Sequence, residues 1–282
     1  MNQRAEATGF FSGHNGLSIF YRHYKAEPER ARMVLAHGLG EHSGRYAHVI
    51  GRMVNKGISV WALDHRGHGK SEGKRGHILS FDEYIFDLKE MITFAQKDMP
   101  ANMKFFLLGH SMGGCMALYF AEMYPAMLSG VIASSPGLHP AMKVPVIKGA
   151  MGKMMSSVWP ALSFDNELDS SFLSHEKSVV EAYNNDPLVH RKVSARWFTE
   201  FMKAMKATFQ GAAKINIPII MQVAGDDHLV DAQMSKRFFE NISSKDKTLC
   251  FYEKFYHEIY NETHQERQRV LTDLENWLAA RI

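Results

Sequence analysis

The clearest chemical pattern in the sequence is the run Gly109-His110-Ser111-Met112-Gly113. It follows a short apolar segment at 105–108, where we expect a strand, and opens the segment 111–124, where we expect a helix. A turn this sharp between strand and helix leaves no room for a side chain at either glycine, and it exposes the Ser111 hydroxyl. The pattern therefore predicts a nucleophilic serine; a glycine-rich helix start capped by serine is the plainer alternative.

A serine hydroxyl becomes an effective nucleophile when a base accepts its proton and an acid orients that base. With this serine motif, the acid and then the base follow the serine along the chain. Three candidate acids follow the strand expected at 217–223, namely Asp226, Asp227 and Asp231. We favour Asp227 over Asp226 from its position in the loop, and we expect Asp231 to cap the next helix.

The predicted base is His257, which follows the strand expected at 247–252. Loops after parallel strands share one edge of a sheet, so this histidine should lie on the same edge as the serine and the acid. His228 lies beside the acid in sequence, and His264 falls within the expected closing helix. A packed core histidine is the alternative interpretation of His257.

Acyl transfer also needs N–H donors for the negative charge that develops on the carbonyl oxygen. The run His37-Gly38-Leu39-Gly40 follows an expected strand at 33–36, and the residue after the serine is Met112. We predict that the backbone N–H groups of Leu39 and Met112 are these donors. The glycine-rich run could otherwise be a simple tight turn.

We expect no metal and no cofactor. Gly69-Lys70-Ser71 resembles the end of a phosphate-binding loop, but Asp64 stands where that loop needs a glycine. His257-Glu258 would open a zinc-binding helix only with a histidine at position 261, which is Asn261 in this chain.

The elements that must position these residues follow from the hydrophobic pattern. Short apolar segments alternate with longer amphipathic ones, which predicts an α/β fold with a mostly parallel sheet flanked by helices. The expected strands are 33–36, 58–63, 105–108, 130–134, 217–223 and 247–252. The expected helices are 45–56, 80–98, 111–124, 231–241 and 262–281. The segment 17–24 is expected to be an antiparallel edge strand.

Residues 137–212 break this alternation, with several Pro and Gly and no clear strand. We interpret them as a helical cap inserted before the last two strands, which leaves 1–136 and 213–282 as the core domain. Such an insertion should lie at the edge of the sheet where ligands bind. Its segment 141–155 combines apolar residues with three lysines, Lys143, Lys148 and Lys153. That composition favours peripheral contact with membranes or micelles; a cap helix with inward-facing methionines is the alternative.

Composition limits the remaining function classes. The 282 residues carry 33 Lys and Arg against 30 Asp and Glu, and the basic residues are scattered, so nucleic acid is not an expected partner. Two cysteines are too few for a disulfide framework. We find no signal-peptide pattern and no apolar run of the roughly 18 residues that a membrane span needs. We expect a cytoplasmic protein that can associate peripherally with membranes.

Four stretches of the sequence resemble one known family: HGLGEHSGRY (37–46), DHRGHGKSEG (64–73), GHSMGG (109–114) and residues 169–187. They are similar to monoacylglycerol lipases and lysophospholipases of the α/β-hydrolase fold. The resemblance covers the chain almost from end to end. The resemblance implies a serine hydrolase that cleaves monoacylglycerols to fatty acid and glycerol through an acyl-enzyme. Transferred residue by residue, it implies the catalytic set Ser111, Asp227 and His257, with Leu39 and Met112 as oxyanion donors.

The resemblance also implies the kind of ligand. A single-chain lipid ester would bind with its glycerol head group near Glu41, Arg45, His110 and Tyr183, and no cofactor would be needed. A lysophospholipase or a carboxylesterase for short and medium chains is the nearest alternative. A hydrolase-fold binding module without activity would be expected to lack a member of the catalytic set, and this chain has a candidate for each role.

Overall fold

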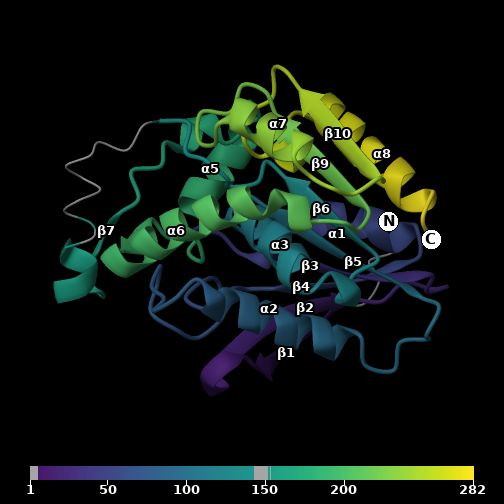
Figure 1. Ribbon diagram of the computed structural model, residues 1–282, viewed down its shortest axis with the longest axis horizontal. Coiled ribbons are helices and arrows are strands. Elements are labelled where there is room, and N and C mark those ends of the chain that lie inside the picture. The colour runs from purple at the N-terminus through teal and green to yellow at the C-terminus, as the bar shows by residue number, and fades with distance from the viewer. Residues whose placement is uncertain (1–5, 143–151, 153) are drawn as a thin grey trace.

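The computed structural model describes residues 6–142, 152 and 154–282, and its centre is an eight-stranded sheet (Figure 1). The strands lie in the order β1-β2-β4-β3-β5-β6-β9-β10, antiparallel from β1 through β2 to β4 and parallel from β4 onward. Their bounds are Glu6–Ser12 (β1), Ser18–Tyr24 (β2), Ala31–Ala36 (β3), Ile58–Leu63 (β4), Lys104–His110 (β5), Gly130–Ser134 (β6), Ile219–Ala224 (β9) and Lys247–Tyr252 (β10).

Helices cover both faces of this sheet because its central strands carry apolar side chains on both faces. One face, which includes Leu35 and Leu108, packs against α1 and α8. The opposite face, which includes Val34 and Leu107, packs against α2, α3 and α7. The helix bounds are Ala47–Asn55 (α1), Asp82–Ala95 (α2), Met112–Met123 (α3), Ala232–Glu240 (α7) and His264–Ala279 (α8). This arrangement confirms the predicted fold class.

The six predicted strands of the parallel part are confirmed, and β4, β6 and β10 have the predicted bounds. The segment 17–24 also contains a strand, β2, but the prediction that it forms the edge was wrong. β1 pairs with β2 along its whole length, from Glu6 opposite Tyr24 to Ser12 opposite Ser18, and takes the edge position. Because the side chains of β1 are mostly exposed, its sequence lacks the apolar pattern of the other strands.

The segment between β6 and β9 contains, in its described part, β7 (Ser163–Asp165), α5 (Lys177–Asn185), β8 (Lys192–Ser194) and α6 (Ala195–Gly211). β7 and β8 form a small antiparallel sheet, so the prediction that this segment holds no strand was wrong. Strands of three residues are too short to show an alternating pattern. α6 lies against α3, the helix that begins after Ser111 (Figure 1). The segment is thereby placed beside the predicted nucleophile.

The lysines predicted to face a lipid surface, Lys143, Lys148 and Lys153, lie outside the described residues. Within the ranges that the structure does describe, no helix combines the length and the apolar character that crossing a membrane requires. A cytoplasmic location stays a prediction.

Candidate active site

Ser111 occupies a strained turn between β5 and α3. Its backbone angles are φ 55° and ψ −118°, in a region that side chains rarely adopt. A Cβ atom on Gly109 would lie 2.0 Å from the carbonyl oxygen of Gly113, and one on Gly113 would lie 2.2 Å from that of Ala36. Both contacts are with backbone atoms, which cannot move aside as a flexible side chain can. The two glycines are therefore required by the turn that presents Ser111.

Three predicted residues meet at this turn. The Oγ atom of Ser111 lies 2.8 Å from Nε2 of His257. The Nδ1 atom of the same imidazole lies 2.7 Å from Oδ2 of Asp227. An ionised carboxylate can only accept, so Nδ1 carries the ring proton and donates it, and Nε2 is left to accept a hydrogen bond from the serine hydroxyl. This is the hydrogen-bond pattern of a nucleophile, a base and an orienting acid.

The neighbouring acids occupy different environments. Asp227 is 2% exposed at its side chain, and its Oδ1 atom accepts the N–H groups of Leu229 and Val230. Asp226 is 55% exposed and pairs with His228. Asp231 accepts two N–H groups in the first turn of α7, as expected for a helix cap. Of the three candidates, only Asp227 contacts the His257 imidazole.

The charge state of His257 is set by two opposing effects. Burial disfavours the imidazolium and by itself would lower the pKa of His257. The Asp227 carboxylate favours the imidazolium through its charge and its hydrogen bond, and Glu258 and Glu41 add to that attraction. The net result is a pKa of His257 above its ordinary value. A base of this kind holds the serine proton more firmly than a free imidazole does.

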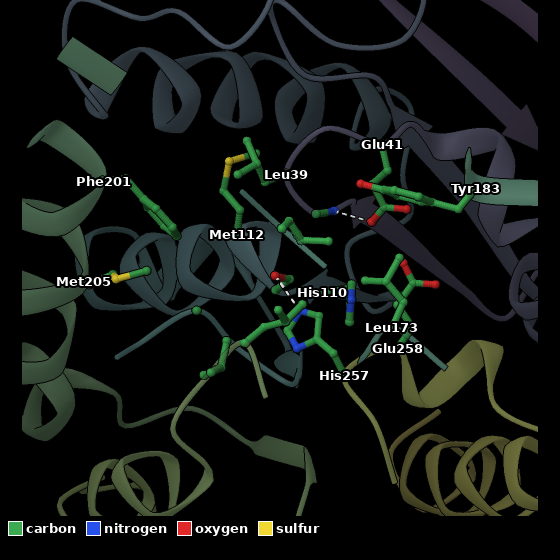
Figure 2. Close-up of a pocket in the computed structure, with 16 residues that line it drawn as sticks. Leu39, Glu41, His110, Met112, Leu173, Tyr183, Phe201, Met205, His257 and Glu258 are labelled. Atoms are coloured by element: carbon green, nitrogen blue, oxygen red, sulfur yellow. Dashed lines mark hydrogen bonds between the residues drawn. The ribbon is translucent and has the colours of Figure 1, made fainter. Parts of the chain in front are cut away.

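The two predicted oxyanion donors, Leu39 and Met112, line the same cavity as Ser111 (Figure 2). Met112 is the first residue of α3, a position whose N–H has no acceptor within the helix. In the described part of the chain, no hydrogen-bond acceptor contacts the Leu39 N–H. The preceding residue, Gly38, donates its N–H to Oε1 of Glu41 at 2.6 Å, which fixes the loop. Neither N–H group has an acceptor among the described residues, so both can receive a developing negative charge.

The cavity at Ser111 has a volume of about 140 Å³ and two sides of different polarity. In Figure 2, Phe201 and Met205 lie to one side of His257, whereas Glu41 and Tyr183 lie to the other. The further apolar lining residues are Leu168, Leu173, Leu229 and Val230. The arrangement suits a ligand with an apolar part and a polar part joined near Ser111.

The four residues expected at the head group do not share one position. Glu41, His110 and Tyr183 line the cavity, but Arg45 is not one of the lining residues. The guanidinium of Arg45 instead donates to Glu41 and Glu258, and the ring of Tyr183 covers it at 4.8 Å. Arg45 therefore lies behind the polar wall of the cavity.

Two kinds of site residue were missed in the sequence. Glu258 directly follows the base and is 4% exposed, but its partner Arg45 is 213 residues away in the chain, so no local pattern reveals the pair. Phe201 and Met205 are spaced i, i+4 on α6, and that spacing could have marked an apolar helix face directed at the cavity.

One group in the described part of the chain has side chains close enough to share a metal ion: His175, Glu262 and Glu266, with ligand atoms within 4.8 Å of one another. The buried Glu262 carboxylate already accepts the N–H groups of Tyr256 and His175, at 2.7 and 3.0 Å. The group joins the segment before α5 to the loop before α8 and to the first turn of that helix. These hydrogen bonds hold the two segments together, so we interpret the group as structural.

The sheet order and the strained serine turn define a serine hydrolase of the α/β-hydrolase fold. The chain belongs to the Hydrolase_4 family, described as serine aminopeptidase S33, whose family model matches residues 27–264. It is 33% identical over 274 residues to the monoacylglycerol lipase of Mycolicibacterium smegmatis, covering 96% of each chain. It is 36% identical over 246 residues to phospholipase YtpA of Bacillus subtilis, covering 86% of this chain and 93% of the relative.

A solved structure supports the same family assignment. The crystal structure of Paleococcus ferrophilus monoacylglycerol lipase superposes with a TM-score of 0.86 at 34% identity, covering 94% of this chain and 99% of that one. The predicted resemblance to the monoacylglycerol lipase and lysophospholipase family of α/β-hydrolases is confirmed.

Proposed function

We propose that this protein hydrolyses monoacylglycerols to a fatty acid and glycerol through an acyl-enzyme on Ser111. The observation that carries the proposal is the chain of contacts from Ser111 through His257 to Asp227, inside a cavity that is apolar on one side and polar on the other. The monoacylglycerol lipases among its relatives support this choice of ester.

The proposed reaction has two halves. The Ser111 oxygen attacks the ester carbonyl while His257 accepts its proton, and His257 then protonates the glycerol oxygen as the ester bond breaks. Water next attacks the acyl-enzyme, again losing a proton to His257, and the fatty acid leaves as Ser111 regains a proton. Asp227 stays ionised and orients the imidazole, and the N–H groups of Leu39 and Met112 bind the oxyanion of both intermediates.

The polarity of the cavity orients the substrate in this proposal. The acyl chain lies along Phe201 and Met205, and the glycerol lies against Glu41, His110 and Tyr183. Burial lowers the pKa of His110 to about 4, so its imidazole is neutral near pH 7 and can share hydrogen bonds with a glycerol hydroxyl.

The segment 137–212 acts as the cap in this account and makes the peripheral lipid contact. Its described part exposes apolar side chains at Met154 (58%), Val158 (78%) and Trp159 (62%). Side chains of this kind gain free energy by entering the interfacial region of a lipid aggregate. They lie within six residues after Lys153, so apolar insertion and attraction to anionic lipid would act together.

Charge favours an uncharged head group over a phosphate. No lysine or arginine is among the described residues that line the cavity. Two carboxylates, those of Glu41 and Glu258, line the cavity. Only one guanidinium, that of Arg45 behind them, balances their charge. A phosphate would meet a net negative charge, whereas glycerol hydroxyls can donate to the carboxylates. Lysophospholipase activity, which the phospholipase relative supports, is therefore the second candidate.

A substrate panel tests the proposal. We would compare kcat/KM for 1-monoacylglycerols and for lysophosphatidylcholines of the same acyl chain, with diacylglycerols and an aminoacyl anilide as controls and the Ser111→Ala variant as blank. We expect at least a tenfold preference for the monoacylglycerol, roughly 1.4 kcal/mol of transition-state binding. A preference for the lysophospholipid or the anilide would overturn the assignment.

A further inference from the structure

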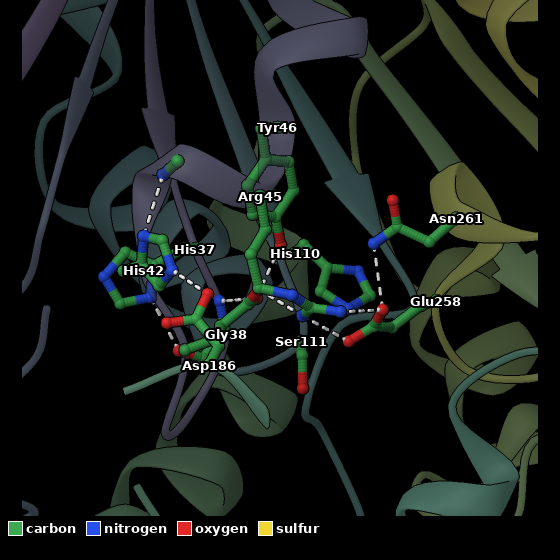
Figure 3. A network of polar contacts seen from close by, with 12 residues as sticks. His37, Gly38, His42, Arg45, Tyr46, His110, Ser111, Asp186, Glu258 and Asn261 are labelled. Atoms are coloured by element: carbon green, nitrogen blue, oxygen red, sulfur yellow. Dashed lines mark hydrogen bonds and ion pairs between the residues drawn. The ribbon is translucent and has the colours of Figure 1, made fainter. Parts of the chain in front are cut away.

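Arg45 lies at a junction between two loops of the site. Its Nη1 atom donates to Oε2 of Glu41 and to Oε1 of Glu258, both at 2.6 Å, and its Nη2 atom donates to Oε2 of Glu258 at 2.7 Å (Figure 3). The three side chains are 10%, 3% and 5% exposed, respectively. A bidentate guanidinium–carboxylate pair fixes orientation as well as distance.

The Glu41 carboxylate connects Arg45 to the oxyanion loop. Its Oε1 atom accepts the N–H of Gly38 and the hydroxyl of Tyr46, each at 2.6 Å. Gly38 immediately precedes Leu39, and a Cβ atom on Gly38 would lie 2.8 Å from this oxygen and 3.3 Å from Cβ of Ser111. The carboxylate thus holds the backbone of the oxyanion loop at the residue directly before Leu39.

The Glu258 carboxylate connects Arg45 to the base loop. Glu258 follows His257 directly, and its Oε2 atom also accepts a hydrogen bond from Nδ2 of Asn261 at 2.9 Å. Its own N–H donates to the carbonyl oxygen of Leu173 at 2.8 Å. The residue beside the base is therefore held at both its side chain and its backbone.

From this geometry we propose that Arg45 is a positioning residue that joins the oxyanion loop to the base loop by binding one carboxylate from each. The inference rests on the proposed function, because it assumes that Leu39 and His257 act on an ester. The ring of Tyr183, from α5, covers the guanidinium and separates it from the cavity. Arg45 thus acts through its two carboxylates, without touching the substrate.

The junction has a net charge of −1, since two carboxylates surround one guanidinium. The groups that face His257 are Asp227 from the loop after β9, Glu258 from its own loop, Glu41 from the loop after β3, and Ser111 and the neutral His110 from the end of β5. Removing the Arg45 charge would leave −2 near the imidazole, and removing the Glu258 charge would leave zero. The two changes should therefore move the titration of His257 in opposite directions.

The test is the pH dependence of kcat/KM on a short, soluble p-nitrophenyl ester. We expect the acidic limb of Arg45→Met to move to higher pH and that of Glu258→Gln to move to lower pH, each by about one unit. The double variant restores the net charge of −1, so its limb should return to the parent position.

In Arg45→Met, kcat should fall about 100-fold with KM changed less than about threefold, as for misplaced catalytic groups. Arg45→Lys should keep the parent limb and recover only part of kcat, because an ammonium cannot form the planar bidentate pair that the guanidinium makes with Glu258.

Arg52→Met is the matched control, since Arg52 on α1 pairs with Glu275 of α8, away from the cavity. It should leave both the limb and kcat unchanged. The inference is overturned if the limbs of the two single variants do not move or move together, or if Arg45→Met raises KM at unchanged kcat. If Arg45→Met does not fold, the acidic limb of Glu258→Gln and the kcat of Arg45→Lys still test the inference. If instead the parent neither hydrolyses the ester nor reacts with a fluorophosphonate, the proposed function itself has failed.

Discussion

Nε2 of His257 lies 2.8 Å from Oγ of Ser111, although 146 residues separate them along the chain. Each residue follows a strand of the parallel part of the sheet, β10 for the histidine and β5 for the serine. Asp227 follows β9, which pairs with β10. The loops that follow parallel strands all lie at the carboxyl-end edge of the sheet. The fold therefore brings all three residues together at this edge.

The two adjacent aspartates should respond very differently to the same substitution. Asp227→Asn keeps the size of the side chain but no longer stabilises the His257 tautomer that accepts the serine proton. We expect kcat to fall by about 10⁴. Asp226→Asn, at an exposed position beside the site, is the control and should stay within about threefold. Steady-state kinetics on one soluble ester checks both, and equal losses would remove Asp227 from its assigned role.

The pKa of His257 predicts where activity is lost on acidification. The base must be neutral to accept the serine proton, and its pKa is raised above the ordinary value of 6.5. Activity should therefore decline as the pH falls through that raised pKa, with kcat/KM reaching half its maximum above pH 6.5. His110 cannot produce this limb, since its pKa is about 4. A half-maximum below pH 6.5, or a flat profile, would contradict the account.

Two glycines in helices should differ in their effect on stability. Gly113→Ala places a Cβ atom 2.2 Å from a backbone oxygen, and we expect the free energy of unfolding to drop by about 3 kcal/mol. Gly51→Ala, on the exposed face of α1, meets nothing within 4 Å and should raise it by up to about 1 kcal/mol. Urea titrations followed by circular dichroism measure both. A tolerated Gly113→Ala would show that the serine turn has room to relax.

Contact with lipid aggregates should depend on charge at the cap. Changing Lys143, Lys148 and Lys153 together to Gln should weaken binding to anionic vesicles and remove most of its salt dependence, at about 1 kcal/mol per lysine. Hydrolysis of a short soluble ester should stay nearly unchanged. Vesicle sedimentation at several salt concentrations gives the result. Parent-like binding and salt response in the triple variant would leave the segment as a lid only.

The serine turn could be predicted because its glycines and serine are consecutive in sequence, and the parallel strands because each is a short apolar run. β1 could not be predicted, since its side chains are largely exposed and its only signal is pairing with β2. The junction at Arg45 was hidden for a related reason. Its two carboxylates come from positions 41 and 258, and only the folded sheet brings them together. Sequence patterns thus identify local turns and cores, whereas contacts between distant loops depend on the fold.

The most direct measurement identifies the atom that a fluorophosphonate modifies. We expect one adduct per chain by intact mass, located on Ser111 by peptide mapping, with ester hydrolysis lost in proportion to labelling. The Ser111→Ala variant should remain unlabelled and inactive, because no other serine in the described part of the chain contacts the His257 imidazole. An adduct on another serine, or full activity in a chain modified at Ser111, would contradict the assignment of Ser111 as the nucleophile.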